Sequence, residues 1–300
     1  MSVYHTPVLL EESIELLGIK ADGVYVDLTF GGGGHSRRIL SALDAAGKLF
    51  AFDQDNEARA NIPDDPRLTF VRSNFRFMRA QLRLLGIREA DGILADLGVS
   101  SHHFDTPERG FSFRSDAPLD MRMNREGELS AAKIINEYPE EELIRIFRDW
   151  GELDGAGPIA RLIVQARSSS PITTTFELIE TVKPRTPRAE ENKFLSKLFQ
   201  ALRIEVNHEM EALKMALEQS LKILRPGGRL VVISYHSLED RLVKNFLRNG
   251  TFSAAPEKDF YGRTQTPFRL LTRKAIVPSE EEIEQNPRSR SAKLRAAEKL

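Results

Sequence analysis

Short apolar runs alternate with helical segments along the first hundred residues of the chain. The apolar runs cover residues 23–30, 48–55, 67–72 and 92–97. Apolar residues recur at helical spacing in the segments that follow the first and third of these runs. Because parallel strands need a crossover, usually a helix, to return the chain, this alternation predicts an α/β fold with a mostly parallel, twisted sheet.

The first run leads into four consecutive glycines, Gly31–Gly34, in the stretch DLTFGGGGHS. A glycine costs about 0.5–1 kcal/mol relative to alanine inside a regular element, so four together indicate that a ligand approaches the main chain. The dinucleotide fingerprint needs a third glycine where Ser36 stands, and a P-loop needs a lysine where His35 stands. The loop therefore fits neither of these phosphate-binding motifs.

Acidic residues stand at or near the ends of three of the runs. Asp27 lies in the first, Asp53 follows the glycines by about 20 residues, and Asp96 lies in the fourth. An acid at the distance of Asp53 can accept both hydroxyls of a ribose, at the sheet edge where such folds bind ligands. This acid-rich cleft favours S-adenosylmethionine, which has a ribose and a cation but no phosphate. Alternatively, the glycines only allow close packing of strand and helix, and the acids are solvated.

A long interruption follows the fourth run. About 130 residues separate it from the next strand-like run, 228–235, although a dozen or so would suffice for a crossover. The intervening residues carry helical patterns and a polar stretch with prolines. We therefore expect a small all-helical domain over residues 106–198, inserted into an α/β domain made of residues 1–105 and 199–300.

Composition narrows the chemistry. The chain has no cysteine, which excludes disulfides, thiolate zinc sites and cysteine nucleophiles. His102 and His103 are neighbours whose side chains point apart, and no third ligand has suitable spacing, so we expect no metal. The absence of cysteine favours the cytoplasm, and no apolar run reaches membrane-spanning length, so we expect a cytoplasmic protein with no membrane partner. The oligomeric state stays open, a dimer included.

The net charge of −1 argues against a globally basic nucleic-acid binder, but the charge is unevenly distributed. Residues 288–299 contain five basic residues and one acidic residue. By composition alone this segment is typical of a solvated surface.

Seven separated motifs resemble, in order, those of the bacterial ribosomal RNA small subunit methyltransferase H family, also called MraW. They are HTPVLL (5–10), TFGGGGHS (29–36), DLGVSS (96–101), RGFSFRSDAPLDMRM (109–123), FQALRIEVN (199–207), SYHSLEDRLVK (234–244) and NPRSRSAKLR (286–295). A set spread over almost the whole chain is far more specific than the glycine loop alone.

The resemblance implies an enzyme that transfers a methyl group from S-adenosylmethionine to the N4 amine of a cytidine in 16S ribosomal RNA. The target would lie near the decoding centre, and the small ribosomal subunit would be the partner. The implied fold is a Rossmann-like methyltransferase domain carrying an inserted helical domain. By similarity, the cofactor contacts are Gly33, Gly34, His35, Asp53, Phe75, Asp96 and His103.

The chain departs from the family pattern at two places. His103 stands where the resemblance leads us to expect glutamine. Phe194, Leu195 and Lys197 stand where a His-Pro pair and a basic residue are expected. The second departure concerns contacts with RNA and leaves the cofactor site untouched.

Asp96 is the predicted catalytic residue. Many enzymes that methylate such amines carry a Pro-Pro-aromatic element after the acid, and this element is missing from DLGVSS. We therefore expect the Asp96 carboxylate, with a backbone carbonyl near Gly98, to accept the amine protons. His236 and Ser237 are further candidates for the pocket, with the alternative that His236 is a buried, hydrogen-bonded residue without a catalytic role.

RNA binding would need stacking and phosphate contacts. Phe111 and Phe113 are candidates to stack on a flipped base, with the alternative that both belong to a hydrophobic core. The expected phosphate contacts are Arg109, Arg114, Arg122, Arg125, Arg288 and Arg290.

Rival functions remain at this point. A nicotinamide-dependent oxidoreductase shares the fold class, but Ser36 and the acid-rich cleft argue against it. A non-catalytic ribosome-assembly factor with a relic pocket is a rival from another class. A methyltransferase that acts on DNA or on another RNA is a third.

Overall fold

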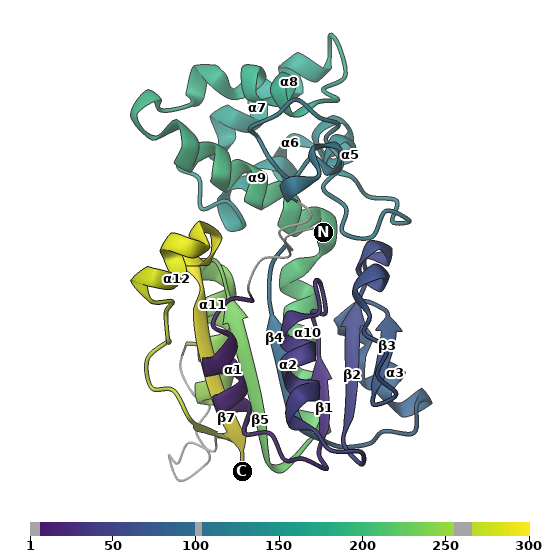
Figure 1. The fold of residues 1–300 in the computed structure, drawn as a ribbon. Helices are drawn as coiled ribbons and strands as arrows, with labels where there is room; N and C mark the ends of the chain where they lie inside the picture. The colour runs from purple at the N-terminus through teal and green to yellow at the C-terminus, as the bar shows by residue number, and fades with distance from the viewer. Residues whose placement is uncertain (1–6, 100–103, 255–265) are drawn as a thin grey trace. The chain divides into compact units, whose positions relative to one another are not determined.

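The computed structural model describes residues 7–99, 104–254 and 266–300, and within these ranges seven strands form one sheet (Figure 1). The strand order is β3-β2-β1-β4-β5-β7-β6. The first five strands run parallel, whereas β7 is antiparallel to both of its neighbours. The strands are β1 (Val24–Asp27), β2 (Lys48–Asp53), β3 (Leu68–Arg72), β4 (Ala90–Asp96), β5 (Leu224–Ser234), β6 (Phe268–Leu270) and β7 (Lys293–Lys299). The predicted α/β class with a mostly parallel sheet is confirmed.

Helices cover both faces of the sheet because neighbouring residues of a strand point to opposite sides. In β1, Tyr25 packs with α1 (Leu10–Leu17) and α2 (Gly34–Ala42), whereas Val26 packs with α3 (Met78–Leu84), α10 (Glu209–Ile223) and α11 (Ser237–Asn249). Strand pairing sets Val26 beside Phe50 of β2 and Ile93 of β4, so apolar side chains continue across the sheet. The carboxyl ends of the parallel strands are thereby fixed at one edge.

The basic C-terminal segment takes a role that its composition does not suggest. Residues 293–299 form β7, which lies between β5 and β6, and Leu294, Ala296 and Ala297 are fully buried. Arg295 pairs with Asp240 at 2.7 Å. The interpretation of this whole segment as a solvated surface is therefore wrong, although Arg288 and Arg290 are exposed.

The inserted segment forms a compact unit of its own, residues 99–209, while residues 1–98 and 210–300 form the other unit. The expected second boundary, 198, falls within α9 (Glu191–Asn207), which continues to Asn207 and contributes Leu202 and Val206 to the helical core. Between Ala131 and Val182 the described residues of this unit form α5 (Ala131–Glu137), α6 (Glu140–Asp149), α7 (Ala156–Arg167) and α8 (Thr175–Val182).

A membrane-crossing helix would need about 20 mostly apolar residues. Among the residues that the structure describes, no helix has the length and hydropathy to cross a bilayer.

Candidate functional site

The carboxyl ends of β1, β2, β4 and β5 carry the polar residues of the candidate site. The strand order reverses between β1 and β4, and such a switch point is where open α/β sheets bind ligands. Asp53 ends β2 and Asp96 ends β4. Tyr235 follows the last residue of β5. The sheet thus brings two of the predicted acids to the same edge.

The glycine loop is tied to β2. Gly31 has a φ of 49°, which favours glycine, and a Cβ atom built there would meet only the Thr29 carbonyl oxygen, at 4.0 Å. The space beside Gly31 is therefore open to a ligand. The Gly31 amide donates a hydrogen bond to Asp53 Oδ2 at 2.8 Å, which fixes the loop against the end of β2.

Gly34 has no room for a side chain, because Pro7 packs against it. A Cβ atom at Gly34 would overlap the ring of Pro7. Gly33 caps the N-terminus of α2 with a φ of 74°, and Gly34 is the first residue of that helix. Gly34 is therefore explained by close packing, although against Pro7 and not between the strand and the helix, whereas the open space at Gly31 fits a ligand.

The two carboxylate oxygens of Asp53 bind two different segments, the glycine loop and the residues that follow β2. Oδ2 accepts the Gly31 amide, and Oδ1 accepts the Asp55 amide at 2.8 Å. Each carboxylate oxygen has a second lone pair, and the residue is half-buried. Asp53 therefore fixes the glycine loop through one carboxylate oxygen and the start of the following turn through the other.

Phe75 lies near the carboxyl end of β2, in a short 3₁₀ turn, η2 (Phe75–Phe77), which directly precedes α3. Asn74 begins the turn by accepting the Arg76 amide, and its Nδ2 donates to Gln54 Oε1 at 2.8 Å. Since Gln54 follows Asp53, the bond holds the turn next to the end of β2. The Phe75 ring is half-buried against the sheet core, which leaves part of it for a ligand.

Asp27 is a structural residue. It is 1% exposed, and its two oxygens accept hydrogen bonds from the Thr29 amide at 3.0 Å and the Ser36 hydroxyl at 2.6 Å. Burial raises the pKa of Asp27. The interpretation of Asp27 as a solvated acid is wrong. Ser36, which breaks the dinucleotide fingerprint, is the residue that bonds Asp27 to the first turn of α2.

Asp96 is held from two sides and stays partly open, with 23% of its side chain exposed. Its Oδ1 accepts the Tyr235 hydroxyl at 2.8 Å, and its Oδ2 lies 3.8 Å from His35 Nδ1. Desolvation raises the pKa of Asp96 to about 6, against the opposing effects of His35 and the Tyr235 hydrogen bond. Burial and the Asp96 charge raise the pKa of Tyr235 well above its usual value, so its hydroxyl stays a donor.

His35 is buried, and its ring contacts the protein on both edges. Nε2 lies 3.2 Å from the Val8 carbonyl oxygen, and Nδ1 faces Asp96. The predicted cofactor contact of His35 stays a prediction, while its ring helps to position Asp96. His103, with Ser100, Ser101 and His102, lies outside the described residues.

His236 has a structural task at the start of α11. Its Nδ1 accepts the Glu239 amide and Glu239 Oε2 accepts the His236 amide, both at 3.4 Å, which together cap the helix. This geometry fits the alternative of a buried, hydrogen-bonded histidine. Ser237, the first residue of the helix, is exposed. Sequence reasoning singled out His236 and Ser237 in this motif and missed Tyr235, the residue that contacts Asp96.

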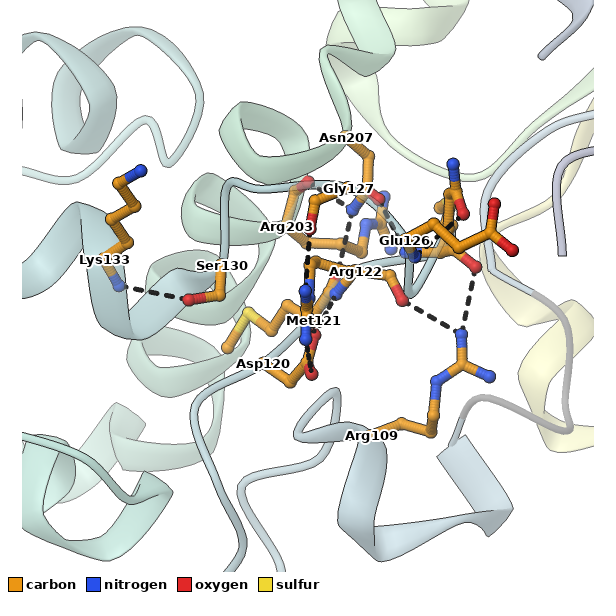
Figure 2. Close-up of polar contacts among 12 residues, drawn as sticks. Arg109, Asp120, Met121, Arg122, Glu126, Gly127, Ser130, Lys133, Arg203 and Asn207 are labelled. Atoms are coloured by element: carbon orange, nitrogen blue, oxygen red, sulfur yellow. Dashed lines mark hydrogen bonds and ion pairs between the residues drawn. The ribbon is translucent and has the colours of Figure 1, made fainter.

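Two of the expected phosphate contacts are structural residues of the helical unit (Figure 2). Arg109 is 1% exposed, and its Nη2 donates to the carbonyl oxygens of Arg122 and Met123 at 2.9 and 3.1 Å. Arg122 forms a bidentate salt bridge with Asp120, in which Nε and Nη2 each donate to one carboxylate oxygen at 2.7 Å. Neither guanidinium is free for RNA. Arg114 and Arg125 are exposed.

The same segment is fastened to the last turn of α9. Asn207 Nδ2 donates to the Met121 carbonyl oxygen, and its Oδ1 accepts the Met123 amide, both at 2.8 Å (Figure 2). Two of the resembling motifs, 109–123 and 199–207, thus meet through Asn207.

The candidates for base stacking, and the positions at which the chain differs from the family pattern, are mainly residues of the hydrophobic core. Phe111 is buried in the helical core, and Phe113 is partly buried with its ring edge-on to Phe199. The prediction that Phe111 stacks on a base is therefore wrong. Phe194 and Leu195 are buried in the same core, so neither presents a side chain to RNA.

Arg109→Met is expected to lower the free energy of unfolding of the helical unit by about 2–3 kcal/mol, because one buried and one partly buried carbonyl oxygen lose their donor. Chemical denaturation followed by circular dichroism measures the change. Arg114→Met, at an exposed position nearby, is the control and should change stability by about 0.5 kcal/mol or less. Equal effects of the two substitutions would contradict the structural role of Arg109.

The model of the MraW methylase family matches residues 2–300. A protein of Parabacteroides distasonis named ribosomal RNA small subunit methyltransferase H is 57% identical over 300 residues, covering 100% of this chain and 98% of that protein. Proteins of the same name from Flavobacterium johnsoniae and Bacteroides thetaiotaomicron are each 58% identical, over 297 and 296 residues. These two alignments cover 99% of this chain and 98% and 97% of the relatives. The similarity therefore includes both compact units.

Proposed function

The chain belongs to the MraW methylase family, and from this premise we propose that it methylates the N4 amine of a cytidine in 16S ribosomal RNA, near the decoding centre. The methyl donor is S-adenosylmethionine, and the partner is the small ribosomal subunit. The observation that carries the proposal is the partly exposed Asp96 carboxylate, held by Tyr235 at the switch point of the sheet. The reaction takes place in the cytoplasm, and the helical unit recognises the substrate.

The residues at the strand ends fit this cofactor. The open space beside Gly31 gives access to main chain, and the half-buried Asp53 carboxylate is of the type that accepts hydrogen bonds from ribose hydroxyls. Phe75 offers a half-buried ring on the same side for the adenine. Gly33, Gly34 and His35 form the start of α2, where backbone amides favour a carboxylate. When bound, S-adenosylmethionine supplies an electrophilic methyl group on a sulfonium.

The protein's task is to present the amine. The N4 lone pair of cytosine is delocalised into the ring, so the amine is a weak nucleophile until it is held in a more pyramidal geometry. Asp96 accepts hydrogen bonds from the amine protons and so directs the lone pair toward the methyl group. Oδ2 is the more available oxygen for this task, because Oδ1 accepts the Tyr235 hydroxyl at 2.8 Å whereas His35 Nδ1 lies 3.8 Å from Oδ2. After transfer, the same carboxylate takes up the proton that the amine loses.

The elevated pKa suits this role. A base is most useful when its pKa lies close to the working pH, and desolvation brings Asp96 to about 6. Activity needs the ionised carboxylate, so turnover should fall as the pH decreases through about 6. The other ionisable groups that act on Asp96 are His35, Asp27, Glu239 and Tyr235.

Tyr235→Phe is expected to move the acid limb of the profile of kcat against pH to higher pH. The Tyr235 hydrogen bond favours ionised Asp96, so its loss raises the pKa of the carboxyl further. The plateau at high pH should change less than the position of the limb. Tyr25→Phe is the control, because the Tyr25 hydroxyl accepts the Lys20 amide at 2.7 Å without contacting Asp96. An unmoved limb in Tyr235→Phe would contradict this positioning role.

The function itself is tested with methyl-labelled S-adenosylmethionine and small ribosomal subunits from cells that lack the gene. The RNA is digested and the labelled nucleosides are identified by mass spectrometry. The expected product is N4-methylcytidine. Cofactor binding without any label would favour the assembly-factor alternative, and label in DNA or in another RNA would redirect the substrate.

A further inference from the structure

Arginines gather along the segment that contains β3 and α3. Residues 66–88 contain six arginines and neither aspartate nor glutamate, although acids make up 44 of the 300 residues of the chain. Arg79, Arg83 and Arg88 are exposed. With the neighbouring Phe77, Leu84 and Leu85 they form what we call the α3 arginine surface.

The three arginines lack carboxylate partners. Among the described residues, none of them forms an ion pair, whereas Arg38 on α2 pairs with Glu11 at 2.9 Å and Arg67 pairs with Asp65 at 2.6 Å. Arg79 and Arg83 are one helical turn apart, so their charges add on one side of α3. Among the described residues, therefore, no ion pair neutralises the charge of Arg79, Arg83 or Arg88.

Apolar groups are exposed among these charges. Phe77, Leu84 and Leu85 are 44%, 82% and 45% exposed. They are not needed in the core, because Met78 and Leu82 bury the opposite side of α3. The Arg76 guanidinium carbon lies 4.7 Å from the centre of the Phe77 ring, a cation–π contact at the surface.

We propose that the α3 arginine surface binds the phosphate backbone of the substrate ribosomal RNA outside the catalytic pocket, with Phe77 against a base or ribose. This inference rests on the proposed function. Phe75 and Phe77 belong to the same turn, so the surface begins beside the expected adenine site. Arginine binds phosphate with two parallel hydrogen bonds and stacks on bases, which suits RNA. A helix of seven residues that already buries one side in the core offers little area to a membrane.

The test compares two triple variants that remove the same charge. Arg79→Gln/Arg83→Gln/Arg88→Gln removes the surface, and Lys244→Gln/Arg248→Gln/Arg273→Gln removes three exposed cations near the opposite end of the sheet. The first is expected to raise the KM for small subunits about ten-fold or more at physiological salt, and to reduce the slope of log KM against log salt by about two to three. Its kcat and its affinity for S-adenosylmethionine should stay unchanged. The control should show a small fraction of these effects.

Three outcomes overturn the inference. The first is an equal rise in KM in both variants, which would show that binding depends on the net charge of the protein and not on this surface. The second is a fall in kcat or in cofactor affinity with KM unchanged. The third is loss of binding to phosphatidylglycerol vesicles in the first variant, with RNA binding intact.

Failure of the proposed function is distinguishable from failure of this inference. If the wild-type protein methylates no small subunit, a fluorescently labelled RNA hairpin replaces the subunit, and its dissociation constant and salt slope are measured for the same three proteins. Weaker binding by the first variant alone would support the surface, and identical binding by all three would reject it.

Discussion

Asp96→Asn is expected to lower kcat for methyl transfer by about 10²- to 10⁴-fold, the range typical of a lost general base. The substitution keeps the size of the side chain and an oxygen for the Tyr235 hydroxyl. It removes the charge that takes up the amine proton, and its amide group presents donors to an amine that also donates. The loss should persist at saturating S-adenosylmethionine, since the defect lies in the chemical step.

Single-turnover kinetics with small subunits measure this loss, and calorimetric titration of the cofactor separates it from weaker binding. Asp91→Asn is the matched control on the same strand. Asp91 is buried at the other end of β4, where it pairs with Lys20 and Arg225. Its substitution should lower stability and leave kcat close to that of the wild type. Undiminished turnover by Asp96→Asn would reject the catalytic role of Asp96.

Asp53→Ala is expected to weaken the binding of S-adenosylmethionine about 100-fold or more. Two hydrogen bonds from ribose hydroxyls to a charged group contribute about 1.5–3 kcal/mol each, and both would be lost. The Gly31 amide would also lose its acceptor, so the glycine loop would no longer be fixed to β2. Both effects act on the same ligand, which makes this the largest change in affinity that we expect.

Titration calorimetry with S-adenosylhomocysteine measures the dissociation constant without turnover. Asp55→Ala is the control, because Asp55 caps the next turn through the Glu57 amide and its loss loosens the loop without removing the ribose acceptor. A dissociation constant for Asp53→Ala equal to that of Asp55→Ala would show that Asp53 acts only through the loop.

The parallel part of the fold could be predicted because its signals are local. The runs at 23–30, 48–55, 67–72 and 92–97 are apolar enough to be buried strands, and each overlaps a strand of the sheet. Strand β7 could not be predicted, because KLRAAEK has no β-branched residue and is rich in helix formers. Its extended form results from pairing with β5 and β6, a tertiary effect that overrides local propensity.

In the candidate site, too, local signals predict some residues, whereas other contacts depend on the tertiary structure. The positions of Asp53 and Asp96 could be predicted, because acids at the carboxyl ends of neighbouring parallel strands meet at one sheet edge. The Tyr235–Asp96 contact joins residues 139 positions apart, and the close approach of Pro7 to Gly34 joins residues from separate segments, so neither has a local signal. Arg109 and Arg122 were expected to contact phosphate, but main-chain carbonyl groups hold the buried Arg109, and Asp120 holds the partly buried Arg122.

The position of β7 between β5 and β6 also dictates an order of assembly. During synthesis β6 leaves the ribosome before β7, yet within the described residues β7 is its only strand partner. Until β7 inserts, β6 has nowhere to pair, and β5 presents an open edge beside the apolar residues Val231 and Ile233. A nascent chain therefore carries an aggregation-prone edge for as long as its last strand is missing, which gives chaperones a defined interval in which to act.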